Sequence, residues 1–410
     1  MDKLKCRFCN NELEYTFVDL GLSPLANGYV SRDMLSSGQY FYPLKVLVCE
    51  SCYMVQVVEF SKPEDIFSKY LYFSSFSKSW LRHCEKYVEM IVSYLNLKKE
   101  SKVCEIACND GYLLQYFKPY DIQPLGIEPA GNVAAKAREK GLNVISEFFN
   151  EKLASSLIKS FGTVDLIIGN NVVAHVPDIN GFARGLAMLL GAGGCITLEF
   201  PHLLNLIKYN QFDTIYHEHY SYFSLLTISK IFKAHNLTIF KTEELNTHGG
   251  SLRIYAAHVG NKRFIPDGSV EIILDKERLY GLDKIKTYVE FNEKIKEIKR
   301  NSIEFLCGIK NQGQSIAAFG AAAKGNTFLN FCGIGRDFID YVADSNPHKL
   351  GMYLPGTNIP IVGYEMIKQS QPDYIVILPW NLSLEIEKEL RDIIKVGSKL
   401  VTFIPDIRVF

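Results

Sequence analysis

A regular alternation of apolar strand-like runs and helical stretches between Lys102 and about Phe200 constrains the fold of this chain most strongly. The strand-like runs read KVCEIA, QPLGIEP, DLIIGNN and GCITLEF. This spacing is typical of a parallel, doubly wound α/β sheet. A second pattern of the same kind begins at Ser315, with SIAAFGAAAKGNTFLNFCG, FIDYVADSN, DYIVILPWN and SKLVTFIPDIRVF. We therefore predict an α/β protein with two such sheets.

The chain length predicts several domains. With 410 residues, of which 47% are hydrophobic, the chain can bury a large core and is too long for one compact domain. The first 60 or so residues alternate short β-like runs with turns. We place a small module at residues 1–65, a first α/β domain at 66–260 and a second at 261–410.

Composition argues against several classes of partner. The formal net charge is +0, so no basic field favours nucleic acid or an anionic membrane. The N-terminal MDKLKCRFCN lacks the apolar core of a signal peptide, and no segment approaches about 18 consecutive apolar residues. We expect a cytoplasmic protein that works on a small molecule. Nothing in the sequence specifies an oligomeric state, and a monomer is compatible with it.

The N-terminal module contains two CxxC pairs, formed by Cys6 with Cys9 and by Cys49 with Cys52. Four thiolates in this pattern suit a tetrahedral zinc ion. A redox function is the alternative, but thioredoxin-type CxxC motifs occur singly at a strand-to-helix turn. Since sulfur would fill all four positions, we predict a structural zinc site with no place for a reacting water.

The first strand of the α/β pattern runs into a small polar turn, which predicts a ligand site. The sequence Glu105-Ile-Ala-Cys-Asn-Asp-Gly111 ends a strand where the backbone must approach a ligand closely. Glu128 ends the next strand, where Rossmann folds bind a ribose diol, and Asn170 ends a third strand at the same edge. An unrelated α/β fold with an acidic strand end is the alternative.

This turn lacks the GxGxxG pattern of dinucleotide sites and resembles the E/D-x-x-x-x-[ND]-G motif of class I methyltransferases that use S-adenosylmethionine (SAM). Two glycines that are usual in that motif are replaced by Ala107 and Cys108. The resemblance implies a set of SAM-binding residues: Glu105, Ala107, Asn109, Asp110, Gly111, Glu128 and Asn170.

The stretch from Asp213 to Phe223, DTIYHEHYSYF, concentrates two histidines, a carboxylate and three tyrosines between Tyr216 and Tyr222. It lacks the HExxH spacing of zinc proteases, because His217 and His219 are two residues apart. In an extended loop, residues two apart point the same way. We therefore expect His217 and His219 on one side of the loop and Glu218 on the other.

The order of the CxxC pairs, the SAM turn, the IYHEH loop and the late AKGNT turn resembles the sugar C-methyltransferase family over essentially the whole chain. That family methylates C3 of nucleotide-linked 4-keto deoxysugars. The resemblance implies a zinc-binding module, a class I SAM methyltransferase domain with a Rossmann-like fold, and a C-terminal Rossmann-like domain. It implies His219 as the base, with Tyr216, Glu218, His175 and a tyrosine of the Tyr70/Tyr72 segment, Tyr72 in our assignment, at the reacting end of the sugar.

The chemistry of such a reaction agrees with these residue types. The C3 hydrogen is acidic only because its removal gives an enolate with the C4 carbonyl, so the site needs a base and donors for the oxyanion. Histidine suits the first need, and Tyr216, Tyr72 and His175 suit the second. We expect Glu218 to orient an imidazole and fix its tautomer. Each residue also has an ordinary alternative: His175 could be structural and Tyr72 could belong to the core.

A glycine-containing turn from Gly320 to Thr327 opens the C-terminal pattern, and its backbone amides suit a pyrophosphate. It lacks the Walker spacing, which argues against an NTPase. Asp344 ends the next strand as a ribose acid would, so a nicotinamide site is an alternative. A turn that only permits packing is another. The family resemblance favours Lys324 and Asn326 near the phosphates of a nucleotide sugar, and we add His217 and Tyr222 as further substrate contacts.

These observations predict a SAM-dependent enzyme that methylates C3 of a 4-keto-6-deoxy sugar carried on dTDP, GDP or a related nucleotide. Methylation of oxygen or nitrogen on a small polar substrate is one alternative. A zinc-ribbon scaffold protein with degenerate nucleotide folds is another. The sequence does not specify the nucleotide, the hexose or the stereochemical outcome at C3.

Overall fold

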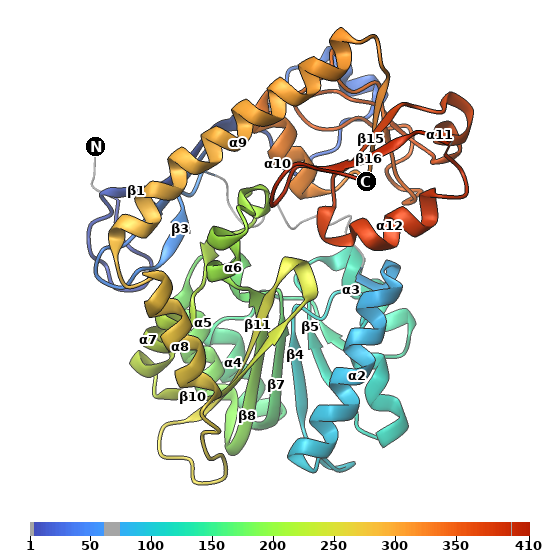
Figure 1. Cartoon of the computed structure of the whole chain (residues 1–410). Coiled ribbons are helices and arrows are strands. Elements are labelled where there is room, and N and C mark those ends of the chain that lie inside the picture. Colours follow the sequence, from blue (N-terminus) through green and yellow to red (C-terminus); the bar gives the residue numbers. More distant parts are fainter. Residues whose placement is uncertain (1–3, 61–73, 395) are drawn as a thin grey trace.

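A computed structural model describes residues 4–60, 74–394 and 396–410, which form three β-sheets with flanking helices (Figure 1). The predicted Tyr72 lies outside these ranges. The α/β class is confirmed. No helix in the described part of the chain is long and apolar enough to cross a membrane.

The N-terminal sheet is antiparallel and has the strand order β1-β2-β3-β9. Its first three strands come from the beginning of the chain, whereas the fourth comes from the loop that contains the predicted base. Their bounds are β1 (Tyr15–Ser23), β2 (Tyr42–Val48), β3 (Val55–Val57) and β9 (Ser221–Tyr222). A short 3-10 helix, η1 (Arg32–Ser36), lies between β1 and β2.

The seven-stranded sheet has the order β10-β11-β8-β7-β4-β5-β6. Strands β8, β7, β4, β5 and β6 are parallel, and β11 and β10 are antiparallel additions. The bounds are β4 (Val103–Ile106), β5 (Leu125–Ile127), β6 (Asn143–Ile145), β7 (Val164–Asn170), β8 (Leu190–Pro201), β10 (Leu237–Leu245) and β11 (Ser251–His258). The four runs predicted from the βα spacing are therefore strands.

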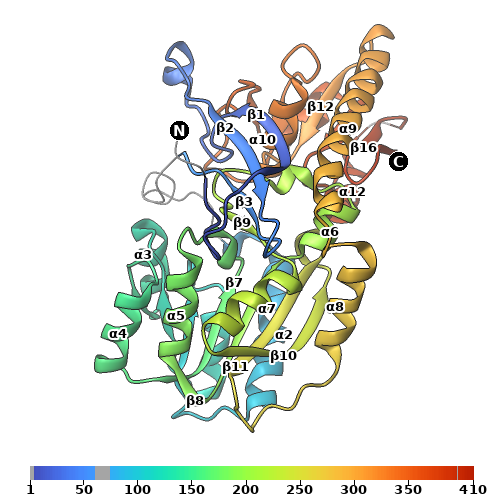
Figure 2. The same ribbon diagram turned by 90° about the vertical axis from the view of Figure 1, so that its left-hand side faces the viewer.

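Helices cover both faces of this sheet (Figure 2). One apolar core contains residues of α4, α5, α7 and α8, and a second contains residues of α2, η3 and α3. The bounds are α2 (Lys78–Leu95), η3 (Leu114–Tyr120), α3 (Gly131–Glu139), α4 (Glu151–Ser160), α5 (Ile179–Leu189), α7 (Leu225–Ala234) and α8 (Ser269–Tyr280). Short segments η4 (Val173–His175), α6 (Leu203–Lys208), η5 (Phe212–Thr214) and η6 (Thr247–Gly249) lie at the carboxyl edge of the sheet.

The C-terminal sheet has the order β14-β13-β12-β15-β16-β17 and is parallel except for β17. Its strands are β12 (Ile316–Phe319), β13 (Val342–Ala343), β14 (Ile361–Val362), β15 (Tyr374–Ile377), β16 (Lys399–Thr402) and β17 (Arg408–Val409). Its helices are α9 (Ile285–Asn311), α10 (Ala323–Cys332), α11 (Glu365–Ser370), η7 (Trp380–Leu382) and α12 (Ser383–Leu390).

The N-terminal and C-terminal sheets share one apolar core, although they lie at opposite ends of the sequence. The long helix α9 joins them, because Phe291 of α9 stacks on Phe17 of β1 with ring centroids 4.9 Å apart. Figure 1 shows these two units above the carboxyl edge of the seven-stranded sheet. Three parts of the chain thus meet at the loop between β8 and β9.

Candidate active site

The turn after β4 has the left-handed backbone typical of a glycine turn, although Ala107 and Cys108 replace two of the usual glycines. Ala107, Asn109 and Gly111 have φ values of +57°, +49° and +76°. The left-handed conformation costs about 1 kcal/mol or more for a residue with a Cβ, so Ala107 is held there at the expense of strain. Gly111 has a positive φ that favours glycine, and a Cβ there would lie 2.1 Å from Leu142 Cδ1, so the leucine side chain would have to move.

Glu128 closes this turn from the neighbouring strand β5. Its carboxylate accepts hydrogen bonds from the backbone N–H groups of Asn109, at 3.0 Å, and Ala130, at 2.8 Å. Burial raises the pKa of Glu128 to about 7, and these two bonds oppose the shift. Glu128, the acid that we assign to a ribose diol, therefore lies against the turn.

Several polar groups at this edge have no hydrogen-bond partner among the described residues. The Nδ2 of Asn170, at the end of β7, and the Oδ1 of Asn171 are both buried and unpaired. Glu105 in β4 is completely buried, and burial raises its pKa well above the usual range. Unpaired buried amides are costly, so this edge fits a polar ligand such as the amino-acid end of SAM.

Asp110 and Asn109 also tie the turn to the segment before α2. The Asn109 Oδ1 accepts a hydrogen bond of 2.9 Å from the backbone N–H of Ser74, and the Asp110 carboxylate accepts one from the Ser75 hydroxyl. Lys140 Nζ lies 3.2 Å from the same carboxylate. The structure thus gives these two predicted SAM-binding residues a role in holding the turn.

The loop with the two histidines is a tight turn and not an extended segment. The backbone N–H of His219 donates to the carbonyl of Tyr216 at 3.0 Å. As a result, His217 turns toward β2, with its Nε2 3.3 Å from the carbonyl of Pro43 and its ring 5.9 Å from that of Tyr42. The expectation that His217 and His219 share one side of the loop is wrong, because the turn reverses the chain between them.

His219 lies in an aromatic cluster with three other predicted site residues. Its ring centroid is 4.1 Å from that of Tyr216, 4.7 Å from that of His175 and 5.9 Å from that of Tyr222. His175 comes from η4, just after β7, whereas the other three lie in or beside the turn. The tertiary structure therefore brings His175 to the loop from 41 or more residues away in sequence.

Backbone carbonyls set the tautomers of both histidines. The Nδ1 of His219 lies 3.0 Å from the carbonyl oxygen of Thr214, and the Nδ1 of His175 lies 2.8 Å from that of Glu218. A carbonyl can only accept, so both Nδ1 atoms must carry hydrogen and each neutral ring keeps its lone pair on Nε2. Burial lowers the pKa of His175 to about 4 and that of His219 well below 6.5. Both rings are therefore neutral bases at neutral pH.

The Glu218 side chain does not orient an imidazole, which corrects our expectation. Its Oε1 accepts a 2.8 Å hydrogen bond from Asn27 Nδ2, and its buried Oε2 has no partner in the part of the chain that the structure describes. Burial raises the pKa of Glu218 to about 7. The carbonyl of Thr214 takes over the expected task, because the turn brings it back to the His219 ring.

The C-terminal unit contacts the same loop through two side chains that the sequence did not single out. Trp380 Nε1 donates to Asp213 Oδ2 at 2.7 Å, and Thr327 Oγ1 donates to the carbonyl of Ile215 at 3.0 Å. Burial raises the pKa of Asp213 to about 6. Asp213 belongs to the polar stretch that marked the loop, but no local signal could have identified its partner 167 residues away.

Lys324 and Asn326 lie at the start of α10 and are held by the chain itself. Lys324 Nζ donates to Asn381 Oδ1 at 2.6 Å and lies 4.8 Å from the centroid of the Trp380 ring. Asn326 Nδ2 donates to the carbonyl of Ala26 at 2.6 Å, while its buried Oδ1 is unpaired among the described residues. Asn326 thus connects α10 to the N-terminal segment, and Lys324 lies beside Trp380, which bonds Asp213 of the loop.

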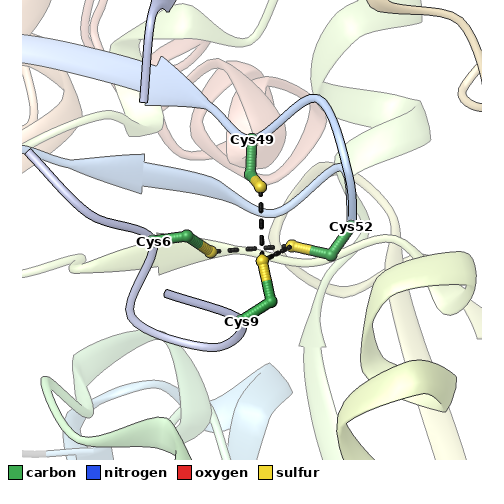
Figure 3. A group of neighbouring side chains, drawn as sticks. All are labelled: Cys6, Cys9, Cys49 and Cys52. Atoms are coloured by element: carbon green, nitrogen blue, oxygen red, sulfur yellow. Dashed lines mark hydrogen bonds between the residues drawn. The ribbon is translucent and has the colours of Figure 1, made fainter. Parts of the chain in front are cut away.

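The four cysteines of the two CxxC pairs converge, as Figure 3 shows. The sulfur of Cys9 lies 3.5 Å from that of Cys49 and 3.6 Å from that of Cys52, and Cys6 lies 3.6 Å from Cys52. A tetrahedron with Zn–S bonds of about 2.3 Å has S···S edges of about 3.8 Å. These distances are much longer than the S–S bond of a disulfide, which is about 2.05 Å, so the four cysteines form no disulfide with one another. The four sulfurs fit a zinc ion, whose chemistry here would be structural.

The chain matches three domain families in sequence. A zinc binding domain matches residues 6–67, a methyltransferase domain matches residues 80–242, and a C-methyltransferase C-terminal domain matches residues 246–405. The C-methyltransferase NovU of Streptomyces niveus is 31% identical over 405 residues, which cover 99% of this chain and 96% of NovU.

Solved methyltransferases resemble part of the chain. A SAM-dependent methyltransferase from Clostridium acetobutylicum shares 12% identity over 44% of this chain and 92% of its own, with a TM-score of 0.35. Magnesium protoporphyrin IX methyltransferase from Synechocystis shares 17% identity over 43% of this chain and 82% of its own, with a TM-score of 0.34.

Proposed function

This chain belongs to the SAM-dependent C-methyltransferase family, and we propose that the carbon it methylates is C3 of a nucleotide-linked 4-keto-6-deoxy sugar. SAM is its methyl donor and its four N-terminal cysteines form a zinc site. Membership in this family leaves no place for the scaffold alternative or for methylation of oxygen or nitrogen as the main reaction.

We assign the base to His219. The observation that supports this is the pairing of its Nδ1–H with the Thr214 carbonyl, which leaves a neutral Nε2 lone pair in a buried aromatic cluster. In this proposal, Nε2 takes the proton from C3, and the C–H electrons form the C3=C4 bond of an enolate whose charge rests on O4. SAM, when bound, would supply the methyl group for the enolate carbon, and the electrons of its methyl carbon–sulfur bond would remain on the sulfur.

The groups around His219 suit the charge that develops on O4. Tyr216 carries a hydroxyl donor, and a protonated Glu218 could also donate because its pKa is about 7. We assign Tyr72, which lies outside the described residues, to the same task. His175 would add a second neutral imidazole. An ionised Glu218 would repel the negative charge on O4, so the protonated form is the better neighbour of the enolate.

We assign the other predicted residues to the two ligands. SAM would be held at the edge of β4, β5 and β7 by Glu105, Ala107, Asn109, Asp110, Gly111, Glu128 and Asn170. The sugar would contact His217 and Tyr222, and its nucleotide phosphates would lie near Lys324 and Asn326. The cationic Lys324 at the junction of the units supports the last assignment.

Solvent deuterium exchange at C3 without SAM tests this proposal, because only enolate formation exchanges that hydrogen. We expect the wild-type enzyme to exchange C3 of a dTDP- or GDP-linked 4-keto-6-deoxyhexose. His219→Ala should bind SAM normally and lose both exchange and methyl transfer, by at least about 100-fold. His258→Ala is the control, since His258 bonds the carbonyl of Leu190 at the opposite edge of the sheet. Exchange that persists in His219→Ala would remove it from the role of base.

A further inference from the structure

The zinc module is built into the backbone that follows the proposed base. Strand β9, Ser221–Tyr222, is the fourth strand of the zinc module's sheet and pairs with β3, where Gln56 faces Ser221. The backbone N–H of Val57 donates to the carbonyl of Tyr220 at 3.0 Å. Tyr220 is the residue directly after His219, so a hydrogen bond to this sheet lies at the residue next to the base.

Arg7 connects the zinc site to the same carbonyl. It lies between Cys6 and Cys9, and its guanidinium donates from Nη1 to the carbonyl of Tyr220 at 3.0 Å and from Nη2 to that of Val57 at 2.8 Å. The guanidinium carbon lies 5.4 Å from the centroid of the Tyr220 ring. Only 14% of the Arg7 side chain is exposed, so these bonds form largely away from water.

Gln56 completes the connection between the zinc ligands and β9. Its Oε1 accepts a 3.0 Å hydrogen bond from the backbone N–H of Arg7, and its Nε2 lies 3.3 Å from the sulfur of Cys6. Gln56 is 2% exposed. The buried side chain of Gln56 therefore contacts a zinc ligand and the Arg7 backbone, while the backbone of the same residue pairs with Ser221 in β9.

We propose that Arg7 is a positioning residue, which couples the zinc-bound CxxC turn to the backbone of residues 219–222 and so sets the position of His219. This inference rests on the proposed role of His219. The Cys6–Cys9 turn can aim the guanidinium at Tyr220 only while the four sulfurs hold that turn together. Zinc then affects methyl transfer through backbone geometry, without touching the substrate.

The size of the expected effect follows from the sensitivity of catalysis to geometry, since a displacement of about 1 Å can reduce a rate about 100-fold. We expect Arg7→Ala to lower kcat for methyl transfer about 10- to 100-fold, with little change in the KM for SAM. Arg7→Lys keeps the charge but has no planar fork to reach two carbonyls, so it should fall between Arg7→Ala and the wild type.

The decisive experiment measures amide hydrogen exchange by mass spectrometry in peptides covering residues 214–222, together with zinc content and kcat. Arg7→Ala with one zinc per chain should exchange these amides faster than the wild type. Removal of zinc from the wild type with a chelator should do the same. Lys230→Ala is the matched control, because Lys230 bonds the carbonyl of Ser51 in the other CxxC turn and makes no hydrogen bond to residues 214–222 among the described residues.

Unchanged amide exchange and unchanged kcat in both Arg7 variants would overturn the inference. If Arg7→Ala loses zinc, Arg7→Lys with zinc bound decides, and it must show faster amide exchange and a lower kcat. The amide measurement needs no substrate, so it stands apart from the proposed reaction. Failure of His219→Ala to lose C3 exchange would refute the base assignment while leaving the amide result to be judged separately.

Discussion

The two doubly wound sheets of this chain share a plan. In each, the first strand, β4 or β12, lies between the strand that follows it, β5 or β13, and a later strand, β7 or β15. In each, an acid after the second strand accepts a hydrogen bond from the turn after the first: Glu128 from the N–H of Asn109, and Asp344 from the N–H of Ala321. Ligands of such sheets bind where the strand order reverses.

The carboxyl edges of the two sheets differ in the hydrogen-bond partners of their polar groups. The edge at β4 leaves Asn170 Nδ2 and Asn171 Oδ1 unpaired among the described residues. At β12, the hydroxyl of Tyr29 and the ammonium of Lys349 both donate to the carbonyl of Ala321, at 2.6 and 2.7 Å. The same topology therefore supplies a SAM site in one unit, and in the other it docks the N-terminal segment at Ala321, three residues before the Lys324 that we assign to the nucleotide phosphates.

The turn after β12 is also closely packed at Gly320 and Ala321. A Cβ on Gly320 would lie 2.5 Å from Pro379 Cδ, so the backbone packs closely against this proline. Tyr29 and Lys349 also bond the carbonyl of Ala321, so the chain itself occupies this part of the turn. We infer that the strand order creates the carboxyl edge of each sheet. Which of its polar groups already have hydrogen-bond partners then decides what the edge can bind.

The largest expected difference between the two units is in how the free energy of unfolding depends on pH, because the first unit contains buried neutral histidines. Burial lowers the pKa of His175 to about 4, while the unfolded chain takes up this proton near pH 6.5. The stability from His175 is therefore lost as the pH falls through this window, by about 3 kcal/mol at pH 4. We expect the free energy of unfolding of His175→Asn to rise by that amount relative to the wild type between pH 7 and pH 4.

Urea unfolding at a series of pH values measures this difference. Above pH 7 the difference between the two proteins should stay constant. Tyr29→Phe, at the other edge, is the control, since it removes no group that titrates below pH 7. A difference for His175→Asn that did not change with pH would mean that this ring has the same pKa in the folded and the unfolded protein.

The two strand-end acids give the next largest contrast. Glu128→Ala should weaken SAM binding about 30-fold, because hydrogen bonds from a ligand to a charged group are worth roughly 2 kcal/mol. Asp344→Ala should change SAM affinity less than about twofold, and should lower the free energy of unfolding by about 2 kcal/mol, since it leaves the N–H groups of Ala321 and Asn346 without their acceptor. Calorimetry with SAM and urea unfolding measure the two effects.

Equal losses of SAM affinity in the Glu128 and Asp344 variants would break the comparison. That result would mean that the second edge also contacts the cofactor. A Glu128 variant with normal affinity would instead place the ribose elsewhere on the first sheet.

The hydroxyl of Tyr29 gives the smallest expected effect. Tyr29→Phe removes its hydrogen bond to the Ala321 carbonyl and should lower the free energy of unfolding by about 1 kcal/mol, with SAM affinity unchanged. Tyr341→Phe is the matched control, because it removes an exposed hydroxyl contact with Ser370 in the same unit. We expect its loss to be below about 0.5 kcal/mol. A larger loss from Tyr341→Phe than from Tyr29→Phe would count against a docking role for the β12 edge.

Several parts of the site could be predicted because their signals are local. The strand at Val103–Ile106, the turn at Ala107–Gly111 and the acid Glu128 follow from apolar runs and turn residues within a short stretch. The paired cysteines carry their own spacing, and the structure places their sulfurs within 4.8 Å of one another. The IYHEH stretch identified the loop, although its conformation was predicted wrongly.

The sequence by itself determined the α/β class, the zinc ligands and the residue types at the loop, because each depends on the chemistry of neighbouring residues. Only the tertiary structure decided which carbonyl orients His219, that Asn27 holds Glu218 and that Arg7 reaches Tyr220. Asn27 and Arg7 lie 191 and 213 residues from their partners. Such hydrogen bonds arise when packed units bring distant groups together, and no pattern of neighbouring residues records them.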